Sequence, residues 1–275
     1  MLTSVGDRVG TGSFRLHSRF RKVANFHNRS EFVSVVDERV GPGPLHLVVS
    51  RFDPTRFSRL RVTEECVELD GIRFPACCAD RYDSSFPGRM GVSDRFPRNR
   101  DLLGELLVRE APDESLAFLL REEVPSFFRT GFRAEVALHV RHCVDLLFSK
   151  GSLQGARGMS GCGFGFTPSG DDFLVGLLLG THLLERVERA DLSTVRAKIL
   201  AAALRGDPAA DTRLRLAGGG RLFPVQRRLV HALLDAGEEE MRSRTRDLLL
   251  LGSTSGADMG TGLFLTLCGG AARWS

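Results

Sequence analysis

The apolar positions of the chain change their spacing near residue 100. Before that point they form short runs that are β-branched or that alternate with polar residues. The clearest strands are expected over 32–36, 45–50 and 66–69. The sequence Gly41-Pro-Gly-Pro44 predicts a turn between two of them, and Asp70-Gly71 predicts a hairpin. This part of the chain is therefore expected to form an antiparallel β unit.

Beyond residue 100 the apolar residues recur at helical spacing. Helices are expected over 101–110, 114–123, 131–150, 171–189, 193–205, 224–236 and 256–271. The segment 82–100 is rich in Pro, Gly, Ser and Arg and separates the two patterns. We therefore predict an α+β fold, with a β-rich unit over 1–100 and a mainly helical unit over 101–275.

The composition is that of an ordinary folded protein and excludes several other classes. Hydrophobic residues make up 42% of the 275 residues and charged residues 26%, which excludes a largely disordered or coiled-coil chain. No apolar run approaches the roughly 20 residues that a membrane-spanning helix needs. Residues 1–20 lack the apolar core of a signal peptide, and the six cysteines form no C-x-x-C pair. We expect a cytoplasmic protein with reduced thiols and no membrane contact.

The charge pattern argues against a nucleic-acid partner. The net charge is +4, and nearly all positive side chains are arginines scattered along the chain. No arginine cluster carries the interleaved aromatic residues of an RNA-binding strand or the pattern of a recognition helix. We therefore expect the basic residues to form a solvated surface.

A glycine-rich segment over 161–180 reads GCGFGFTPSGDDFLVGLLLG. Its glycines at Gly161, Gly163 and Gly165 allow backbone conformations that are closed to residues with a Cβ atom. Free backbone N–H groups and the positive end of a helix dipole are expected to follow them. That combination is suited to binding phosphate or carboxylate.

Two starts are open for the helix that follows. Thr167 can be the N-cap, with Pro168 at the first helical position. Alternatively Ser169 can be the N-cap, with Asp172 three residues later completing a capping box. Neither the P-loop nor the dinucleotide-binding pattern is present.

A second copy of this pattern lies 86 residues further along the chain. Aligning Ser169 with Ser255 also matches Gly170 with Gly256 and Asp172 with Asp258. The shared pattern is Ser-Gly-x-Asp-x-x-x-Gly-Leu-x-Leu, and each copy opens an apolar helix. In both copies the aspartate and the later glycine are four residues apart and therefore lie on one helix face.

We hypothesise that the two helices pack together with their N-termini converging, so that Asp172 and Asp258 flank one pocket. The two carboxylates could hold Mg²⁺ or act as acid and base beside a small anionic substrate. Asp171 is a weaker catalytic candidate, because adjacent helix residues point about 100° apart. The alternative is that both segments are capped core helices whose glycines serve packing alone. The candidate substrate-binding residues are Gly161, Gly163, Gly165, Thr167, Ser169, Gly170, Ser255 and Gly256.

Three further segments are interpreted more simply. Cys162 lies near a helix start that can lower the pKa of its thiol, although a small side chain in a crowded turn is the simpler interpretation. Asn25, His27 and Asn28 form a polar cluster that could reach a site, although a surface turn is the simpler interpretation. The stretch 211–221 is expected to be a flexible connection, in which Thr212 and Arg213 can contribute to an anion pocket.

With both motifs in hand, the sequence resembles the AllH-like family, whose named member is a subunit of oxamate carbamoyltransferase in allantoin breakdown. The segment 161–174 carries most of the resemblance, and 252–262 supports it in order and spacing. The resemblance implies a role in transferring a carbamoyl group between phosphate and oxamate within a multi-subunit enzyme. It also implies a partner subunit similar to a CoA-ligase α chain.

Two other functions stay open from the sequence. The chain can be a non-catalytic assembly subunit whose motifs fix only its fold and its interface. It can also be a standalone enzyme that depends on Mg²⁺ and a nucleotide.

Overall fold

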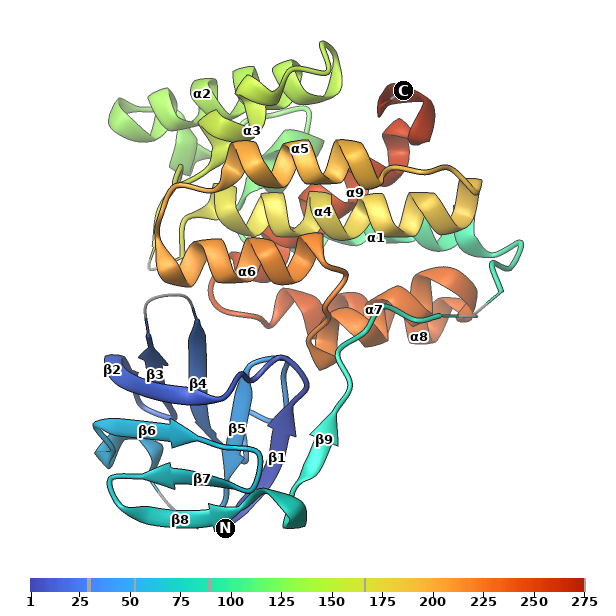
Figure 1. Cartoon of the computed structure of the whole chain (residues 1–275). Coiled ribbons are helices and arrows are strands. Elements are labelled where there is room, and N and C mark those ends of the chain that lie inside the picture. Colours follow the sequence, from blue (N-terminus) through green and yellow to red (C-terminus); the bar gives the residue numbers. More distant parts are fainter. Residues whose placement is uncertain (29–30, 52, 89–90, 166, 275) are drawn as a thin grey trace. The chain divides into compact units, whose positions relative to one another are not determined.

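The computed structural model describes residues 1–28, 31–51, 53–88, 91–165 and 167–274 (Figure 1). Phe166, in the middle of the predicted glycine-rich segment, lies outside the described residues. The chain divides into two compact units. Unit 1 comprises Met1–Ser85 with Arg221–Pro224, and unit 2 comprises Phe86–Gly220 and Val225–Ser275.

Unit 1 is a curled sheet in the order β8-β7-β6-β2-β3-β4-β5-β1-β9 (Figure 1). Its apolar residues alternate along the strands, and those that point inward form one core that includes Phe14, Phe26, Leu47 and Leu60. The strands are β1 (Leu2–Gly6), β2 (Gly12–Phe20), β3 (Val23–His27), β4 (Phe32–Asp37), β5 (His46–Val49), β6 (Arg59–Val62), β7 (Cys66–Leu69), β8 (Ile72–Pro75) and β9 (Asp80–Tyr82).

Most neighbouring strands in this sheet are antiparallel, as predicted, and β4–β5 and β1–β9 are parallel. The hairpin at Asp70-Gly71 is confirmed: Leu69 pairs with Ile72, and both turn residues have positive φ (44° and 89°), as a type I′ turn requires. The predicted Gly41-Pro-Gly-Pro44 segment lies between β4 and β5 and returns the chain to the start of a parallel neighbour.

The sequence suggested a surface turn at Asn25, but the structure does not have one there. It lies in β3, where its side chain donates to Ser18 Oγ (3.0 Å) and accepts from Ser34 Oγ (2.7 Å). These cross-strand bonds satisfy the polar side chain inside the sheet, so a polar residue is compatible with a strand there.

Unit 2 is helical and is organised around one buried helix, α4. Nearly every residue of the first four turns of α4 is buried, as expected for a helix that is apolar on all sides. The helices are α1 (Phe96–Glu110), α2 (Gly131–Phe148), α3 (Leu153–Met159), α4 (Ser169–Glu188), α5 (Ser193–Ala203), α6 (Pro208–Gly218), α7 (Pro224–Asp235), α8 (Glu238–Leu249) and α9 (Ser255–Gly269). The α+β fold class is thereby confirmed.

Two predictions for unit 2 were wrong. The segment expected as a helix over 114–123 forms only a short 3-10 turn at Leu116–Leu120. The stretch expected as a flexible connection over 211–221 lies mostly in α6. Asp207 caps that helix by accepting from the N–H groups of Ala209 and Ala210, and Pro208 occupies its first turn, so the start signal is local.

Helices α4 and α9 cross closely and run in the same direction (Figure 1). A Cβ atom on Gly176 would lie 1.9 Å from the carbonyl oxygen of Met259, and one on Gly262 would lie 2.1 Å from that of Phe173. Only glycine lets the two backbones approach this closely. The repeated glycine is therefore explained by the crossing of the two helices.

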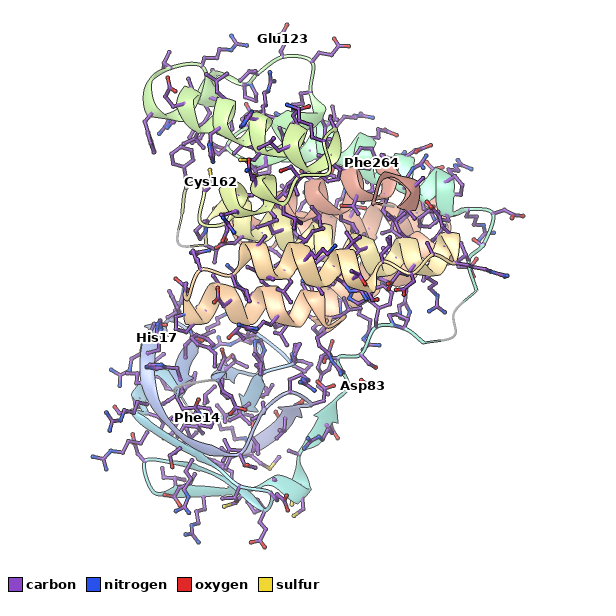
Figure 2. The ribbon with its side chains drawn as sticks, turned by 45° about the horizontal axis from the view of Figure 1, so that its top comes forward. Phe14, His17, Asp83, Glu123, Cys162 and Phe264 are labelled. Atoms are coloured by element: carbon purple, nitrogen blue, oxygen red, sulfur yellow. The ribbon has the colours of Figure 1, made fainter. Side chains whose placement is uncertain are left out.

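Helix α9 is packed on its other side by α1. A Cβ atom on Gly104 of α1 would overlap the ring of Phe264, which Figure 2 shows on α9. A second small residue thus brings a third helix against the pair.

Candidate functional site

The starts of α4 and α9 meet, as predicted from the repeated pattern. Thr167 Oγ1 lies 3.0 Å from Ser255 Oγ, and it donates a hydrogen bond of 3.1 Å to Asp172 Oδ2. Neither predicted cap forms, because α4 begins at Ser169 with Pro168 at the N-cap position and no side-chain cap. The hydroxyl groups that would cap the helix instead contact groups across the helix pair.

Asp172 is almost fully buried, at 1% exposed, and is held by a cation. Arg213 on α6 donates from Nη1 to Asp172 Oδ1 over 2.7 Å, and the arginine side chain itself is 30% exposed. Burial raises the pKa of Asp172, while Arg213 and the hydroxyls of Ser255 and Thr167 oppose that rise. Asp172 thus belongs to a buried ion pair whose cationic end reaches solvent.

Asp258 is fully buried, and none of the described residues places a cation beside it. Its Oδ1 accepts from the backbone N–H of Leu116 (2.6 Å), and within the described part of the chain its Oδ2 has no hydrogen-bond partner of normal geometry. Burial raises the pKa of Asp258 to about 7, against the lowering effects of the Leu116 amide and the hydroxyls of Ser169 and Thr254. The negative charge of Asp172 raises it further.

The serine hydroxyl of each segment lies near the aspartate of the other segment. Ser255 of the second segment lowers the pKa of Asp172 in the first, and Ser169 of the first lowers that of Asp258 in the second. The four side chains therefore form one polar cluster where two positive helix ends converge. Such a cluster can hold an anion, and a carboxyl group that is neutral near pH 7 can donate or accept a proton.

Asp171 faces a different set of groups. Arg205 binds both of its carboxylate oxygens, with Nη1 at 2.7 Å and Nη2 at 2.9 Å, and the backbone N–H of Gly161 donates to Oδ1 (2.8 Å). Asp171 is only 1% exposed, so its negative charge is buried together with this cationic partner. Its carboxylate connects Gly161 of the glycine-rich loop to Arg205, which follows the end of α5, and its catalytic role stays a prediction.

The three alternating glycines all have positive φ: 77° at Gly161, 111° at Gly163 and 95° at Gly165. A side chain on Gly163 would also meet the Cβ atom of Ser169 at 2.8 Å. The loop thus needs glycine for its conformation and, at one position, for contact with the start of α4.

Two of the predicted substrate-binding amides are engaged inside the protein. The N–H of Gly170 donates to the carbonyl oxygen of Cys162 (2.8 Å), and that of Gly256 donates to Leu251 (3.0 Å). A Cβ atom at Gly170 would lie 1.9 Å from the carbonyl oxygen of Met159. Packing against the preceding segment accounts for glycine at both positions.

Cys162 is not activated as its position near a helix start suggested. Burial raises the pKa of its thiol, and the charge of Asp171 raises it further. Figure 2 shows Cys162 on the loop that leads into α4. A raised pKa keeps the thiol protonated and unreactive near neutral pH.

The surroundings of the two carboxyl groups bear on whether they can hold Mg²⁺. In the described residues, no group of three or more His, Cys, Asp and Glu side chains is gathered in a way that could hold a metal ion. Asp172 already binds a guanidinium, and Asp258 keeps its proton up to about pH 7. Because Mg²⁺ requires several oxygen ligands in octahedral geometry, this donor set does not fit it. Magnesium binding stays a prediction from the sequence.

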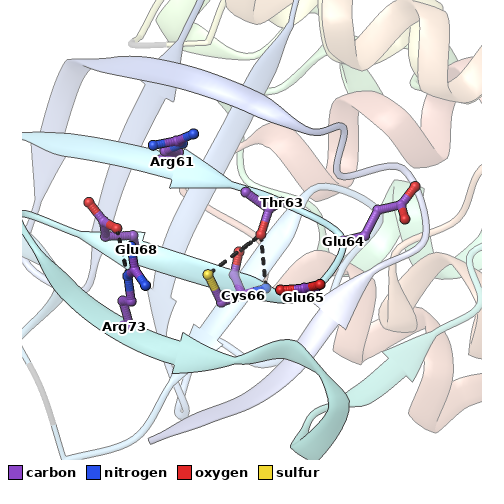
Figure 3. Close-up of a pocket in the computed structure, with 7 residues that line it drawn as sticks. All are labelled: Arg61, Thr63, Glu64, Glu65, Cys66, Glu68 and Arg73. Carbon is purple, nitrogen blue, oxygen red and sulfur yellow. Dashed lines mark hydrogen bonds and ion pairs between the residues drawn. The ribbon is translucent and has the colours of Figure 1, made fainter.

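A shallow cavity of about 380 Å³ lies in unit 1 (Figure 3). Two of its lining residues, Glu68 and Arg73, form an ion pair at 3.1 Å, so their charges neutralise each other. Arg61, Glu64 and Glu65 also line this cavity, which lies outside the segment that carries the two motifs. Elsewhere, none of the helices built from described residues has the length and hydropathy needed to cross a membrane.

Several residues of the site were missed at the sequence level. Arg205 carried no signal, Thr254 lies in the second motif without having been singled out, and the Leu116 N–H is a backbone group that no side-chain pattern reveals. Arg213 was predicted as a possible anion contact, but the helix on which it lies, α6, was not predicted. The Asp207-Pro208 start of α6 was the available signal for that helix.

Residues 159–267 match the family model described as oxamate carbamoyltransferase subunit AllH. The matched segment begins at the end of α3, contains both Ser-Gly-x-Asp segments and ends within α9. The resemblance predicted from those two motifs is confirmed for this part of the chain, which is less than half of its length. No curated protein and no solved structure matches the chain.

Proposed function

We propose that this chain is a subunit of a carbamoyltransferase-type enzyme and that the paired starts of α4 and α9 bind its small anionic substrate. The observation that carries the proposal is the convergence of the two helix starts around Asp172, Asp258 and Arg213 inside the segment that matches the AllH family. Carbamoyl phosphate and oxamate, the ligands implied by the resemblance, are both small anions.

The charge balance supports an anionic ligand. Arg213 neutralises Asp172, and Asp258 is uncharged below its pKa of about 7. The carboxyl groups therefore add little net negative charge at neutral pH. The positive ends of two helix dipoles then favour an anion, while the hydroxyls of Thr167 and Ser255 are engaged with each other and with Asp172.

The partially exposed guanidinium of Arg213 is the proposed charged contact. One of its N–H groups is used by Asp172, and a guanidinium has five such donors. A carboxylate or phosphate can accept from the donors that remain. Asp172 then acts as a positioning residue that holds the arginine.

The subunit description also supports a multi-subunit enzyme, with a CoA-ligase-like chain as the proposed partner and the cytoplasm as the proposed compartment. The rival function is an assembly subunit without chemistry of its own. An Asp172→Asn variant separates the two. If the assembled complex forms and loses activity, the catalytic proposal holds; if it no longer assembles while the isolated chain stays folded, the assembly function holds.

Direct binding tests the site itself. We expect isothermal titration to detect carbamoyl phosphate, oxamate or inorganic phosphate binding to the full chain. We expect Arg213→Met to weaken that binding by roughly tenfold to a hundredfold, the value of a charge-assisted hydrogen bond. Arg215→Met is the matched control, because Arg215 is exposed on the same helix. Equal affinity in wild type and Arg213→Met would refute the proposed contact.

The third function is tested by thermal shift. Stabilisation by ATP with Mg²⁺, but by neither carbamoyl phosphate nor oxamate, would favour a standalone nucleotide-dependent enzyme. Stabilisation by the small anions in the absence of Mg²⁺ supports the proposal above.

A further inference from the structure

Two adjacent cysteines, Cys77 and Cys78, lie in the short 3-10 turn Ala76–Cys78 between β8 and β9. Their Sγ atoms are 3.8 Å apart, and both residues are exposed. The turn is anchored at its start, because the N–H of Ala76 donates to the carbonyl oxygen of Glu65 (2.8 Å), and it is closed by the N–H of Ala79, which donates to the carbonyl oxygen of Ala76 (3.2 Å). The two thiols are therefore presented to solvent from an anchored backbone.

The surroundings favour two thiols over a disulfide. Adjacent α carbons are about 3.8 Å apart across a trans peptide, whereas disulfides usually span roughly 4.4–6.8 Å, so a direct bond between the two sulfurs would be strained. The neighbouring Cys77 thiol also raises the pKa of Cys78. A higher pKa lowers the thiolate fraction, which slows thiol–disulfide exchange near neutral pH.

A single atom that bonds to both sulfurs avoids this strain. Such an atom sits between the sulfurs, so they need only a small rotation from their present separation. Zinc would need about four ligands, and no group of three or more His, Cys, Asp and Glu side chains that could hold a metal occurs in the described residues. Trivalent arsenic with one organic substituent has two valences left, which matches the two thiols.

We propose that Cys77 and Cys78 form a binding site for a trivalent organoarsenical, with the arsenic atom bridging both sulfurs. In the reaction with an arsenoxide, the arsenic–oxygen bonds are replaced by two arsenic–sulfur bonds. The two thiol protons leave with the oxygen as water. No atom changes its oxidation state, so no oxidant or reductant is required. The site is independent of the function proposed for unit 2.

Cys66 and Cys268 provide the controls. Cys66 lies on β7, where it is half-buried and 3.5 Å from the hydroxyl of Thr63 in the cavity of Figure 3. Cys268 is exposed on α9, in the other unit. Neither has a cysteine adjacent to it in the sequence, so each can supply only one thiol from its own segment.

The test uses phenylarsine oxide and native mass spectrometry of the full, reduced chain. We expect one adduct per chain, with the mass of the reagent less one water. The adduct should resist excess glutathione, a monothiol, and should be released by dithiothreitol. Cys77→Ser and Cys78→Ser should each lose the glutathione-resistant adduct, whereas Cys66→Ser and Cys268→Ser should keep it.

Three outcomes would overturn the proposal. They are no adduct on the wild-type chain, a glutathione-resistant adduct that survives in either Cys77→Ser or Cys78→Ser, and loss of that adduct in Cys66→Ser or Cys268→Ser. Because Cys77 and Cys78 are exposed, serine is compatible with the fold, and circular dichroism of each variant verifies it.

Discussion

The two Ser-Gly-x-Asp segments of unit 2 differ chiefly in what surrounds their carboxyl groups. In the first segment, Asp172 has a guanidinium at 2.7 Å. In the second, the groups around Asp258 in the described part of the chain are a backbone amide and hydroxyl groups, without an arginine. The residue before each aspartate also differs, because Asp171 of the first segment aligns with Ala257 of the second.

This difference shows how one repeated motif can supply two chemical groups. The backbone arrangement is shared, down to a glycine in each helix that faces a carbonyl oxygen of the other. The neighbouring elements then set the charge, with α6 bringing a cation to Asp172 and the turn at Leu116 bringing a neutral donor to Asp258. Burial raises the pKa of both carboxyl groups, and at Asp172 the nearby guanidinium opposes that rise.

The largest expected effect comes from breaking the shared crossing. Gly176→Ala and Gly262→Ala each place a Cβ atom about 2 Å from a backbone oxygen. We expect each variant to lower the free energy of unfolding by more than about 3 kcal/mol, since neither backbone can move without displacing a helix. Denaturant unfolding followed by circular dichroism measures this. Gly91→Ala is the control, because nothing lies within 4 Å of its Cβ position, and an equal loss there would contradict the explanation.

The second prediction concerns how the free energy of unfolding depends on pH through Asp258. The pKa of Asp258 rises from 3.8 to about 7 on folding, so the unfolded chain loses this proton first as pH increases. Relative to the state in which Asp258 is ionised, the protonated carboxyl stabilises the fold fully below about pH 4. This contribution to the free energy of unfolding is lost as the pH rises to about 7. Its full size is about 4 kcal/mol. We expect Asp258→Asn, compared with wild type at pH 4.5 and pH 8, to lack this loss. A parallel pH dependence in the two proteins would show that Asp258 is ionised in the folded state.

The third prediction replaces Asp171 of the first segment by alanine, the residue type found at the matching position, Ala257, of the second. Asp171→Ala leaves Arg205, which is partly exposed and can be hydrated, without its partner, and we expect a loss of about 2 kcal/mol. Arg205→Met should cost more, because it leaves a buried carboxylate unpaired. Unfolding of both single variants and the double variant gives the coupling. Strictly additive losses would exclude a direct pairing.

The smallest effect concerns these two serine hydroxyl groups. Ser255→Ala should cost about 1 kcal/mol, the value of its hydrogen bond with Thr167, and Ser169→Ala should cost less. Ser255→Ala should raise the pKa of Asp172, and Ser169→Ala should raise that of Asp258, because each hydroxyl lowers the pKa of the opposite carboxyl. Carboxyl NMR titration of both variants measures this, and a shift in the aspartate of the same segment alone would contradict this arrangement.

The repeated pattern was a strong guide because it describes contacts within and between two helices. The spacing of Ser169, Asp172 and Gly176, found again 86 residues later, predicted that the two starts converge. The α+β class followed from the change in apolar spacing near residue 100. In both cases the information is local or repeated, so one sequence is enough to show it.

What the sequence did not reveal depends on long-range partners. The guanidinium beside Asp172 comes from α6, and the amide beside Asp258 comes from a 3-10 turn that resembled an ordinary helix. The parallel pairs in unit 1 depend on which strand a connection leads to, and strand propensity does not encode this. Whether Asp172 and Asp258 carry a charge therefore became visible only in three dimensions.

The mutual fit of Gly176 and Gly262 also constrains how the two segments can change. Each helix rests against the bare backbone of the other, so a larger residue on one side would separate both aspartates at once. A change that preserves the spacing of the carboxyl groups must alter the two halves in concert. Redesign of this protein toward a bulkier ligand should therefore begin at the arginine and hydroxyl groups around the crossing and leave its glycines unchanged.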